Sequence, residues 1–390
     1  MATDDIERLR RLHAEMTAWR RDLHAHPEIA FHERRTSEFL ARTLSGFGVA
    51  VSSGLAGTGV VGTLSRGTSR RSVALRADMD GLPLQETTGL PYGSQAPGAM
   101  HACGHDGHMA MLLGAARHLA EAGRFDGTVH FVFQPAEENE GGGRVMVEEG
   151  LFDRFPADAV FGLHNWPGLP AGRFGVRPGP VMAAFDVFDV AVHGRGGHGA
   201  MPHLAVDPVV AAAEMISAFQ TIVSRNVSPV EAAVVSVTQV QGGETWNVIP
   251  EEVRLRGSTR YFLPEVGRVV EEGVRRVAAG VASAFGVRAD VDYRRRYPAT
   301  VNAPAETAIA ARVAAEVAGP EGVTADLPPS LASEDFAFML QARPGCYACL
   351  GNGPAEEGRV LHGPRYDFND EILPVGAAYW VHLTETVLSG

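Results

Sequence analysis

Residues 100–108 read Met-His-Ala-Cys-Gly-His-Asp-Gly-His, a stretch that places one thiol, three imidazoles and a carboxylate close together. Apolar residues then recur at helical spacing from Met109 to Ala120, which predicts a loop leading into a helix with Asp106 as its candidate cap. A thiolate and an imidazole suit zinc, cobalt, nickel or manganese better than calcium or magnesium. A buried free cysteine and a structural histidine would explain Cys103 and His105 equally well, so this stretch alone leaves metal binding open.

Side chains of the kind that metals and acid-base chemistry use follow three short apolar runs. These are Val73–Leu75 before Asp78 and Asp80, Val129–Phe133 before Glu137 and Glu138, and Val160–Leu163 before His164. Helical patterns are expected at Ile6–Ala25, Thr36–Leu44, Met109–Ala120, Gly143–Glu149, Thr307–Ala318 and Val375–Leu388. The alternation indicates an α/β fold with an open, mostly parallel sheet and flanking helices. Ligands bind outside the carboxyl ends of such strands, so we expect a metal site at that edge.

The pattern changes near Phe185, which indicates a second domain. The order strand, helix, strand, strand, helix, strand is that of a ferredoxin-like α+β unit. Its expected elements are Asp186–His193, Asp207–Val223, Ala232–Gln241, Glu252–Tyr261, Glu265–Phe285 and Arg288–Arg295. Asp207 and Pro208 suit a helix cap and the first helical residue. We therefore expect an inserted lid domain at residues 186–296, and a catalytic metal-binding domain formed by residues 1–185 and 297–390.

Composition limits the partners and the location of the protein. Among 390 residues, 46 are acidic and 34 are lysine or arginine, and the net charge of −12 disfavours nucleic acid as a partner. The N-terminus lacks the apolar run of a signal peptide, and no stretch approaches the roughly 18 consecutive apolar residues of a membrane helix. Three cysteines argue against a disulfide framework, so we expect a cytoplasmic protein that binds no membrane. We expect Cys346 and Cys349 to lie in an apolar strand rather than to form a zinc knuckle or a redox pair.

Five candidate ligands are more than one open catalytic zinc uses and fit two metal ions that share a bridge. They are Cys103, His105, one of Glu137 and Glu138, His164 and His362. Two metals can acidify a water and polarise a carbonyl, while a nearby carboxylate carries the proton to a leaving amine. The residues themselves do not say which glutamate is the ligand and which is the base. A solvated acidic turn is the alternative interpretation of this pair, since Asn139 and Glu140 follow it.

Two other functional classes lack support. Residues 194–199, Gly-Arg-Gly-Gly-His-Gly, match the dinucleotide-binding fingerprint after an expected strand. The helix that would hold the pyrophosphate begins only near Asp207, and no acidic residue closes the next strand, so we reject this interpretation. The sequence also contains no G-x-S-x-G elbow of a serine hydrolase.

Several motifs together resemble the metallo-amidohydrolase branch of the aminoacylase and carboxypeptidase family. That branch includes hippurate hydrolases, N-acyl-amino-acid amidohydrolases and auxin-conjugate hydrolases. The motifs are Arg76–Pro83, His101–His108, Gln134–Glu138, Gly162–Asn165 and Gly197–His203. Further matches at Leu23–Glu28 and Leu361–Pro364 extend the resemblance over nearly the whole chain.

The resemblance assigns roles to the candidate site residues. It implies that two divalent ions (Zn, Mn, Co or Ni) are bound by Cys103, His105, Glu138, His164 and His362. Cys103 would bridge the ions, Glu137 would be the general base and acid, and Asp78 would orient a ligand without binding metal.

The resemblance also implies roles for the inserted domain. It would form a homodimer, and His198 would steady the oxyanion in its own or a partner's site. Asn247 and Arg260 would contact the carbonyl and the carboxylate of the substrate, although a solvated charge at a strand edge explains Arg260 equally well. In the other domain, the candidates for an acyl pocket are Trp166, Phe338 and Tyr366, which core packing would explain just as well.

We thus expect a two-domain metalloenzyme that cleaves the amide of a small N-acyl amino acid into a carboxylic acid and a free amino acid. A dipeptidase or carboxypeptidase of the same fold is the nearest alternative. A binding protein that kept the fold without catalysis is a second one. The sequence does not define the acyl group, the amino-acid preference or the physiological metal.

Overall fold

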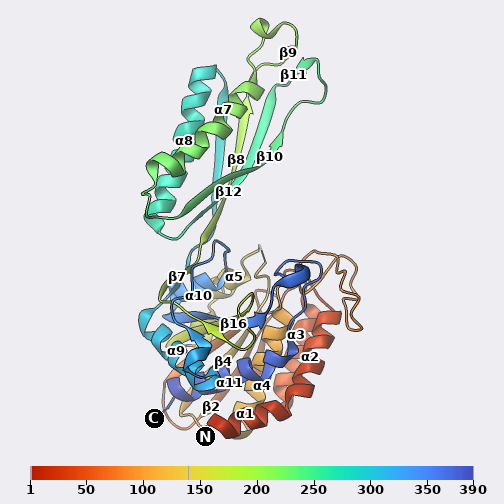
Figure 1. The fold of residues 1–390 in the computed structure, drawn as a ribbon, viewed down its shortest axis with the longest axis vertical. Helices are drawn as coiled ribbons and strands as arrows, with labels where there is room; N and C mark the ends of the chain where they lie inside the picture. Colours follow the sequence, from red (N-terminus) through yellow and green to blue (C-terminus); the bar gives the residue numbers. More distant parts are fainter. Residues whose placement is uncertain (1, 139, 390) are drawn as a thin grey trace. The chain divides into compact units, whose positions relative to one another are not determined.

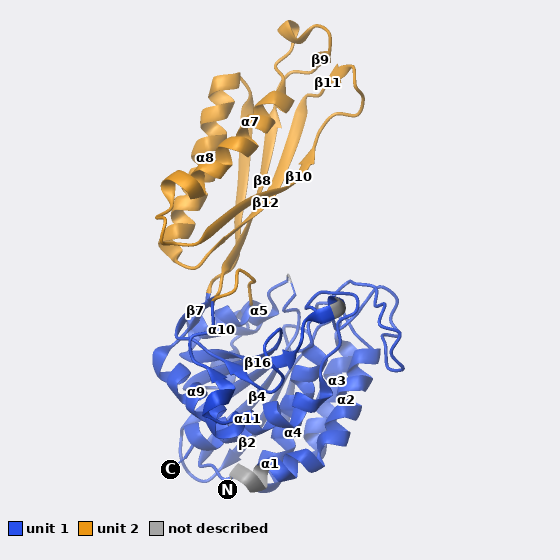
Figure 2. Ribbon diagram, in the orientation of Figure 1, with its two compact units in different colours: residues 1–181, 300–328, 335–390 blue, residues 182–299, 329–334 orange. Residues whose placement is uncertain are grey.

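The computed structural model describes residues 2–138 and 140–389, and the chain divides into two compact units (Figure 2). Unit 1 comprises residues 1–181, 300–328 and 335–390. Unit 2 comprises residues 182–299 and 329–334. The expected insert at 186–296 does not include the short second segment of unit 2.

Unit 1 is built on an eight-stranded mixed sheet (Figure 1). In spatial order its strands are β1 (Ala50–Leu55), β2 (Gly59–Arg66), β4 (Gly127–Gln134), β3 (Ser72–Asp78), β5 (Ala159–Pro167), β16 (Gly345–Gly353), β6 (Phe174–Gly175) and β15 (Val323–Thr324). The four central strands, β4, β3, β5 and β16, run parallel. Every residue of β3 is buried, as expected for a strand covered on both faces. The predicted α/β class is therefore confirmed, and Cys346 and Cys349 lie buried in β16.

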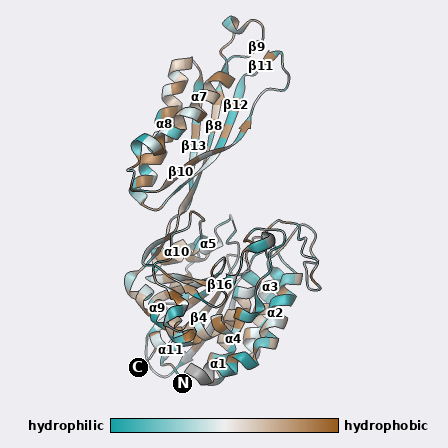
Figure 3. Ribbon diagram, viewed as in Figure 1, coloured by the Kyte–Doolittle hydropathy of each residue, from teal (hydrophilic) through white to brown (hydrophobic). Residues whose placement is uncertain are grey.

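Helices surround this sheet. They are α1 (Ala2–Arg11), α2 (His13–Ala25), α3 (Arg34–Gly46), α4 (His105–Ala122), α5 (Gly142–Glu148), α6 (Leu151–Arg154), α9 (Pro304–Ala318), α10 (Phe336–Ala342) and α11 (Leu373–Val387). The buried helix α4 packs against α2 and α11, whereas α2 and α3 carry many hydrophilic residues, teal in Figure 3. The prediction of one helix over Ile6–Ala25 is wrong, because the helix is interrupted at Leu12, whose N–H bonds to both Arg8 and Leu9.

Unit 2 has a four-stranded antiparallel sheet in the order β10 (Ala233–Gln241), β12 (Glu252–Tyr261), β8 (Ala184–His193) and β13 (Arg288–Tyr297). Helices α7 (Pro208–Thr221) and α8 (Pro264–Phe285) pack against it, and burial alternates along β8 as expected when one sheet face is covered. The chain order β8-α7-β10-β12-α8-β13 is the predicted ferredoxin-like one. Asp207 caps α7 by accepting a bond from the Val209 N–H, as predicted.

Smaller elements complete the chain. A short antiparallel ladder pairs β9 (Gly197–His198) with β11 (Val248–Ile249), and β7 (Gly179–Met182) pairs with β14 (Thr300–Asn302). Within the described residues, no helix has the length and apolar character needed to cross a membrane.

The first turn of α4 is closely packed, which gives a test of the fold. A Cβ built on Gly107 would lie 2.2 Å from the Phe368 ring, which is itself buried. We expect Gly107→Ala to lower the free energy of unfolding by about 1–3 kcal/mol, because the ring has to move. Gly280, in the middle of α8, is the matched control, since its Cβ would meet nothing within 4 Å.

Urea denaturation measures both variants. Gly280→Ala should leave stability unchanged or raise it by up to about 1 kcal/mol, the difference in helix propensity. Equal stability of Gly107→Ala and the parent protein would contradict the packing described for α4.

Candidate metal centre

The loop before α4 has a conformation that requires glycine. Gly104 has a φ of 90°, and a Cβ at this position would lie 2.3 Å from the side-chain nitrogen of Asn165. The same nitrogen donates a hydrogen bond to the Cys103 carbonyl, at 2.6 Å. Tyr366 holds Asn165 in turn, because its hydroxyl donates to the amide oxygen at 2.7 Å. These contacts fix the backbone from which Cys103 and His105 project.

Asp106 does not cap α4, contrary to the prediction. Gly104 occupies the cap position, and Asp106 lies inside the first turn. One of its carboxylate oxygens accepts a bond from His24 Nδ1 at 2.8 Å and lies 3.6 Å from the Arg20 guanidinium. Charged partners offer stronger hydrogen bonds than a backbone amide does, so the carboxylate is used between helices instead.

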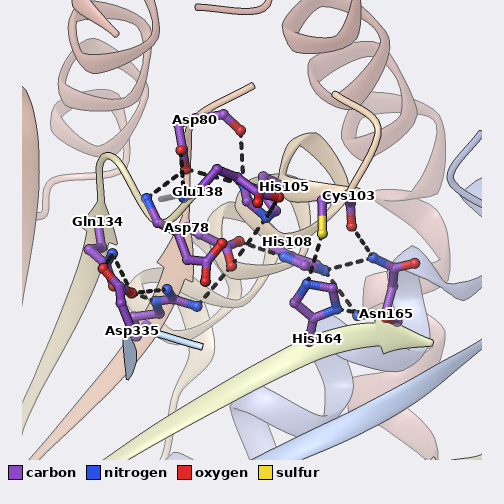
Figure 4. A network of polar contacts seen from close by, with 12 residues as sticks. Asp78, Asp80, Cys103, His105, His108, Gln134, Glu138, His164, Asn165 and Asp335 are labelled. Carbon is purple, nitrogen blue, oxygen red and sulfur yellow. Dashed lines mark hydrogen bonds and ion pairs between the residues drawn. The ribbon is translucent and has the colours of Figure 1, made fainter. Parts of the chain in front are cut away.

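The five candidate ligands come together at the carboxyl edge of the parallel strands, and Figure 4 shows four of them, Cys103, His105, Glu138 and His164. Cys103 Sγ lies 3.4 Å from His164 Nε2. His105 Nε2 and His362 Nε2 lie 4.0 Å and 3.1 Å from the same oxygen of Glu138. Cys103, His105 and Glu138 also place ligand atoms within 4.8 Å of one another. His362 arrives on an exposed loop with a φ of 61°, and its N–H bonds to the Ala102 carbonyl.

Hydrogen bonds distinguish the histidines that can bind a metal from one that cannot. His105 and His164 each bond through Nδ1 to a backbone carbonyl, at 2.8 Å and 2.7 Å, which leaves the Nε2 lone pair free to face the site. His108 lies among them, but its Nδ1 donates to Asp78 at 2.6 Å and its Nε2 accepts from the Asn165 N–H at 2.9 Å. Both nitrogens of His108 are therefore used.

Two buried atoms of the site make no hydrogen bond among the described residues, His105 Nε2 and Glu138 Oε1. Buried polar groups normally have partners, so each such atom calls for an explanation. A cation between a neutral imidazole and a carboxylate would satisfy both atoms at once. The donor set of one sulfur, three nitrogens and one carboxylate suits zinc and its neighbours in the first transition series.

The charge balance of the site points the same way. Burial raises the pKa of the Cys103 thiol well above its usual range, and the nearby carboxylates, Glu138 foremost, raise it further. Burial acts to lower the pKa of His105, but Asp78 and the other carboxylates outweigh it and raise that pKa to about 10. The surroundings thus favour positive charge at His105 Nε2, where a proton and a metal ion compete for one lone pair. Burial lowers the pKa of His164 well below its usual range, so its imidazole is neutral.

Asp78 already has partners for both carboxylate oxygens. One accepts from His108, and the other accepts from the Arg76 guanidinium at 2.8 Å. Arg76 also lies 3.1 Å from Asp335 and donates to Gln134 at 2.8 Å. Figure 4 shows Gln134 and Asp335 side by side. Asp78 is therefore placed to orient its neighbours.

Three predicted site residues lie in unit 2. His198 is exposed on β9, opposite Val248 of β11, and Asn247 immediately precedes β11 and accepts a bond from the Gly199 N–H. The Arg260 guanidinium lies 4.1 Å from the centre of the Phe185 ring and lines a cavity of about 490 Å³. Its Nη1 is buried without a hydrogen-bond partner among the described residues, and burial lowers its pKa, so Arg260 is not a fully solvated charge.

The aromatic candidates for an acyl pocket divide into two kinds. Tyr366 is fully buried and bonds to Asn165, so the core interpretation holds for it. Trp166 and Phe338 are half-buried, and the Trp166 ring lies 6.4 Å from the His164 ring. Sequence reasoning gave no role to Asn165. The only sequence signal for Asn165 is its position directly after His164 in the motif Gly162–Asn165.

Residues 74–386 match the family model described as peptidase family M20/M25/M40. The chain is 40% identical to a hippurate hydrolase of Campylobacter jejuni, over 95% of this chain and 96% of that protein. It is 38% identical to an N-acetylcysteine deacetylase of Bacillus subtilis, over 96% and 97% of the two chains. The crystal structure of a dinuclear metal-binding M20 peptidase from Bacillus subtilis superposes with a TM-score of 0.84 at 35% identity, covering 97% of this chain and 99% of that one.

A buried ion pair beside this site predicts a pH dependence of stability. Burial acts to lower the pKa of His24, but Asp106 outweighs it and raises that pKa from 6.5 to about 9, with help from Glu86. Because the folded-state pKa is the higher one, the stabilisation is fully present below pH 6.5 and is lost as the pH rises through about 9. The difference in stability between the parent protein and His24→Gln should therefore shrink above pH 9.

Urea unfolding of both proteins across this range checks the prediction. The variant serves as the reference for all other groups that titrate in the same window. A constant difference from pH 6.5 to above 9 would show that His24 carries no proton in the folded protein.

Proposed function

Because the chain belongs to peptidase family M20/M25/M40, we propose that it is a two-metal amidohydrolase that cleaves the amide of small N-acyl amino acids. The products are a carboxylic acid and a free amino acid. The observation that carries the proposal is the meeting of Cys103, His105, Glu138, His164 and His362 at one sheet edge, with two buried ligand atoms that make no hydrogen bond among the described residues. The relatives named hippurate hydrolase and N-acetylcysteine deacetylase support the substrate class.

These five residues would hold two divalent ions, with Cys103 as the sulfur ligand. The donor types fit zinc, manganese, cobalt or nickel. When bound, the ions would acidify a shared water and polarise the amide carbonyl. Asp78 would act through His108 and Arg76 rather than as a ligand.

Glu137 is the proton-transfer group in this proposal. It follows the carboxyl end of β4, lies buried next to Glu138, and is not one of the five proposed ligands. Its carboxylate takes a proton from the attacking water and delivers it to the leaving nitrogen. A buried position excludes bulk water from this transfer.

Unit 2 supplies the remaining substrate contacts in this proposal. His198 steadies the oxyanion, in its own or a partner's site, and Asn247 contacts the carbonyl. Arg260 binds the carboxylate of the amino acid, which its unpartnered Nη1 favours. A guanidinium that lines a cavity and has a buried nitrogen without a hydrogen bond among the described residues is suited to a carboxylate ligand.

We also propose a homodimer formed through unit 2 and a cytoplasmic location. Large apolar side chains are exposed near the β9–β11 pair, and Trp246 is 99% exposed. Exposed apolar patches of this kind are typical of protein interfaces. The three free cysteines suit a reducing compartment. Sedimentation equilibrium tests the dimer, which a monomeric mass at all concentrations would exclude.

A substrate panel tests the function. We expect N-acetyl, N-benzoyl or indole-acetyl amino acids to be hydrolysed after loading with zinc, manganese, cobalt or nickel, and a chelator to abolish the activity. Faster cleavage of unblocked dipeptides would favour the dipeptidase alternative. Absence of hydrolysis with every metal would favour a binding protein.

Two substitutions separate the roles of the site residues. Glu137→Gln should keep the metal content and lower kcat by about 100- to 10,000-fold, because only the proton-transfer group is removed. Cys103→Ala should instead lose metal, because the sulfur ligand is gone. Elemental analysis and initial rates measure both effects. Unchanged turnover of Glu137→Gln would remove Glu137 as the base, and full metal retention by Cys103→Ala would remove Cys103 as a ligand.

A further inference from the structure

One buried carboxylate holds the backbone of the segment that carries both glutamates (Figure 4). Asp80, just after β3, is 1% exposed. Its Oδ1 accepts a bond from the Glu137 N–H at 3.1 Å, and its Oδ2 accepts from the Glu138 N–H at 3.0 Å. The backbone carbonyl of Asp80 also bonds to His105 Nδ1 at 2.8 Å. A single residue thus contacts three members of the candidate site.

A second buried carboxylate extends this arrangement by one residue. Glu33 Oε1 accepts a bond from the Ala136 N–H at 2.9 Å, and its Oε2 accepts from the Thr58 hydroxyl at 2.7 Å. Three consecutive N–H groups, from residue 136 to residue 138, are therefore bound by two carboxylates. Ala136 has a φ of 54°, in the left-handed region that residues other than glycine rarely adopt. Such a conformation persists only where surrounding contacts impose it.

The choice of carboxylates here is electrostatically unfavourable, which argues against a purely structural role. Burial, together with the charge of Asp80, raises the pKa of Glu33 to about 7, so the two side chains disfavour each other. Water or a carbonyl could satisfy the same N–H groups without placing more negative charge beside an acidic site. Bidentate carboxylates, however, fix the direction of successive amides more strictly than neutral acceptors do.

We propose that Asp80, assisted by Glu33, is the positioning residue of this centre. It sets the backbone so that Glu137 faces the water and Glu138 faces the metal ions, and its carbonyl turns His105 Nε2 toward the same point. It touches neither the substrate nor the metal. The inference rests on the proposed function for the role of Glu137, and on the site geometry alone for Glu138 and His105.

Asp80→Asn tests the proposal. Asparagine offers one oxygen where two N–H groups need an acceptor, and its NH₂ group would face the other N–H. We expect kcat to fall and zinc affinity of the metal-free protein to weaken, each by about 10- to 100-fold, the usual effect of removing the support of a metal ligand. KM should stay unchanged, because no substrate contact is removed. Calorimetric titration with zinc gives a readout that does not depend on activity.

Asp126→Asn is the matched control. Asp126 Oδ1 also accepts from two consecutive backbone amides, those of Thr68 and Ser69, at 2.6 Å and 2.7 Å. It directly precedes β4, at the opposite end of that strand from Glu137. We expect this variant to keep the kcat and the zinc affinity of the parent protein.

A pair of Glu33 variants gives an independent test of the positioning role. This test remains available if Asp80→Asn does not fold. Glutamine can keep both contacts of Glu33, because its oxygen accepts from Ala136 and its NH₂ donates to the Thr58 hydroxyl. Glu33→Gln should therefore keep zinc affinity and kcat, whereas Glu33→Ala should weaken both. This rescue by the isosteric variant would not follow from a loss of charge or of stability alone.

The outcomes separate this inference from the proposed function. If the parent protein hydrolyses no N-acyl amino acid, the proposed function fails, and the zinc titrations still decide the positioning role. Folded Asp80→Asn with zinc affinity and kcat equal to those of the control overturns the inference, even if its melting temperature falls. Equal behaviour of Glu33→Ala and Glu33→Gln overturns the contribution of Glu33.

Discussion

The burial of several acidic side chains at one site is the constraint on which the rest of this structure depends. A thiol and several carboxylates lie at the carboxyl edge of the sheet, where burial raises the pKa of Cys103 and acidic neighbours raise the pKa of His105. A low dielectric makes such a group of charges costly unless positive charge balances it. The Arg76 guanidinium supplies part of the balance for Asp78. The remaining positive charge would lie between His105 Nε2 and Glu138 Oε1, which are 4.0 Å apart and make no hydrogen bond among the described residues.

The parallel sheet makes this concentration of charge possible. β3, β4 and β5 run side by side in one direction, so their carboxyl ends deliver Asp78, Glu137 and His164 to one edge. The turn at Gly104, before α4, brings Cys103 and His105 to the same edge, and His362 reaches it on a loop later in the chain. The two buried candidate ligands His105 and His164 are each oriented by a second contact, the bond from Nδ1 to a backbone carbonyl.

The sequence was sufficient to predict the strands, the class of fold and the meeting of the candidate ligands. An apolar run that ends in polar side chains indicates a parallel strand and its carboxyl end, because a parallel strand is buried along its length. Contacts formed between distant elements were not predictable in this way. Asp106 has the local signature of a helix cap, yet it binds His24 of another helix. Asp80 appeared as one more acidic residue, since nothing in the sequence reveals that it accepts from two amides 57 and 58 residues away. The break at Leu12 likewise leaves no proline or glycine as a sign.

The topology of unit 1 has a consequence for how the protein is made. Helix α4 lies early in the chain, but it packs against α11, which occupies the last residues. Strand β16, which completes the parallel core beside β5, also follows the whole of unit 2. A ribosome therefore releases the hydrophobic surface of α4 and one edge of β5 long before their partners exist. Unit 2 can fold during synthesis, whereas unit 1 has to wait for the end of translation, and its unfinished sheet is the part of the nascent chain most exposed to aggregation and most dependent on chaperones.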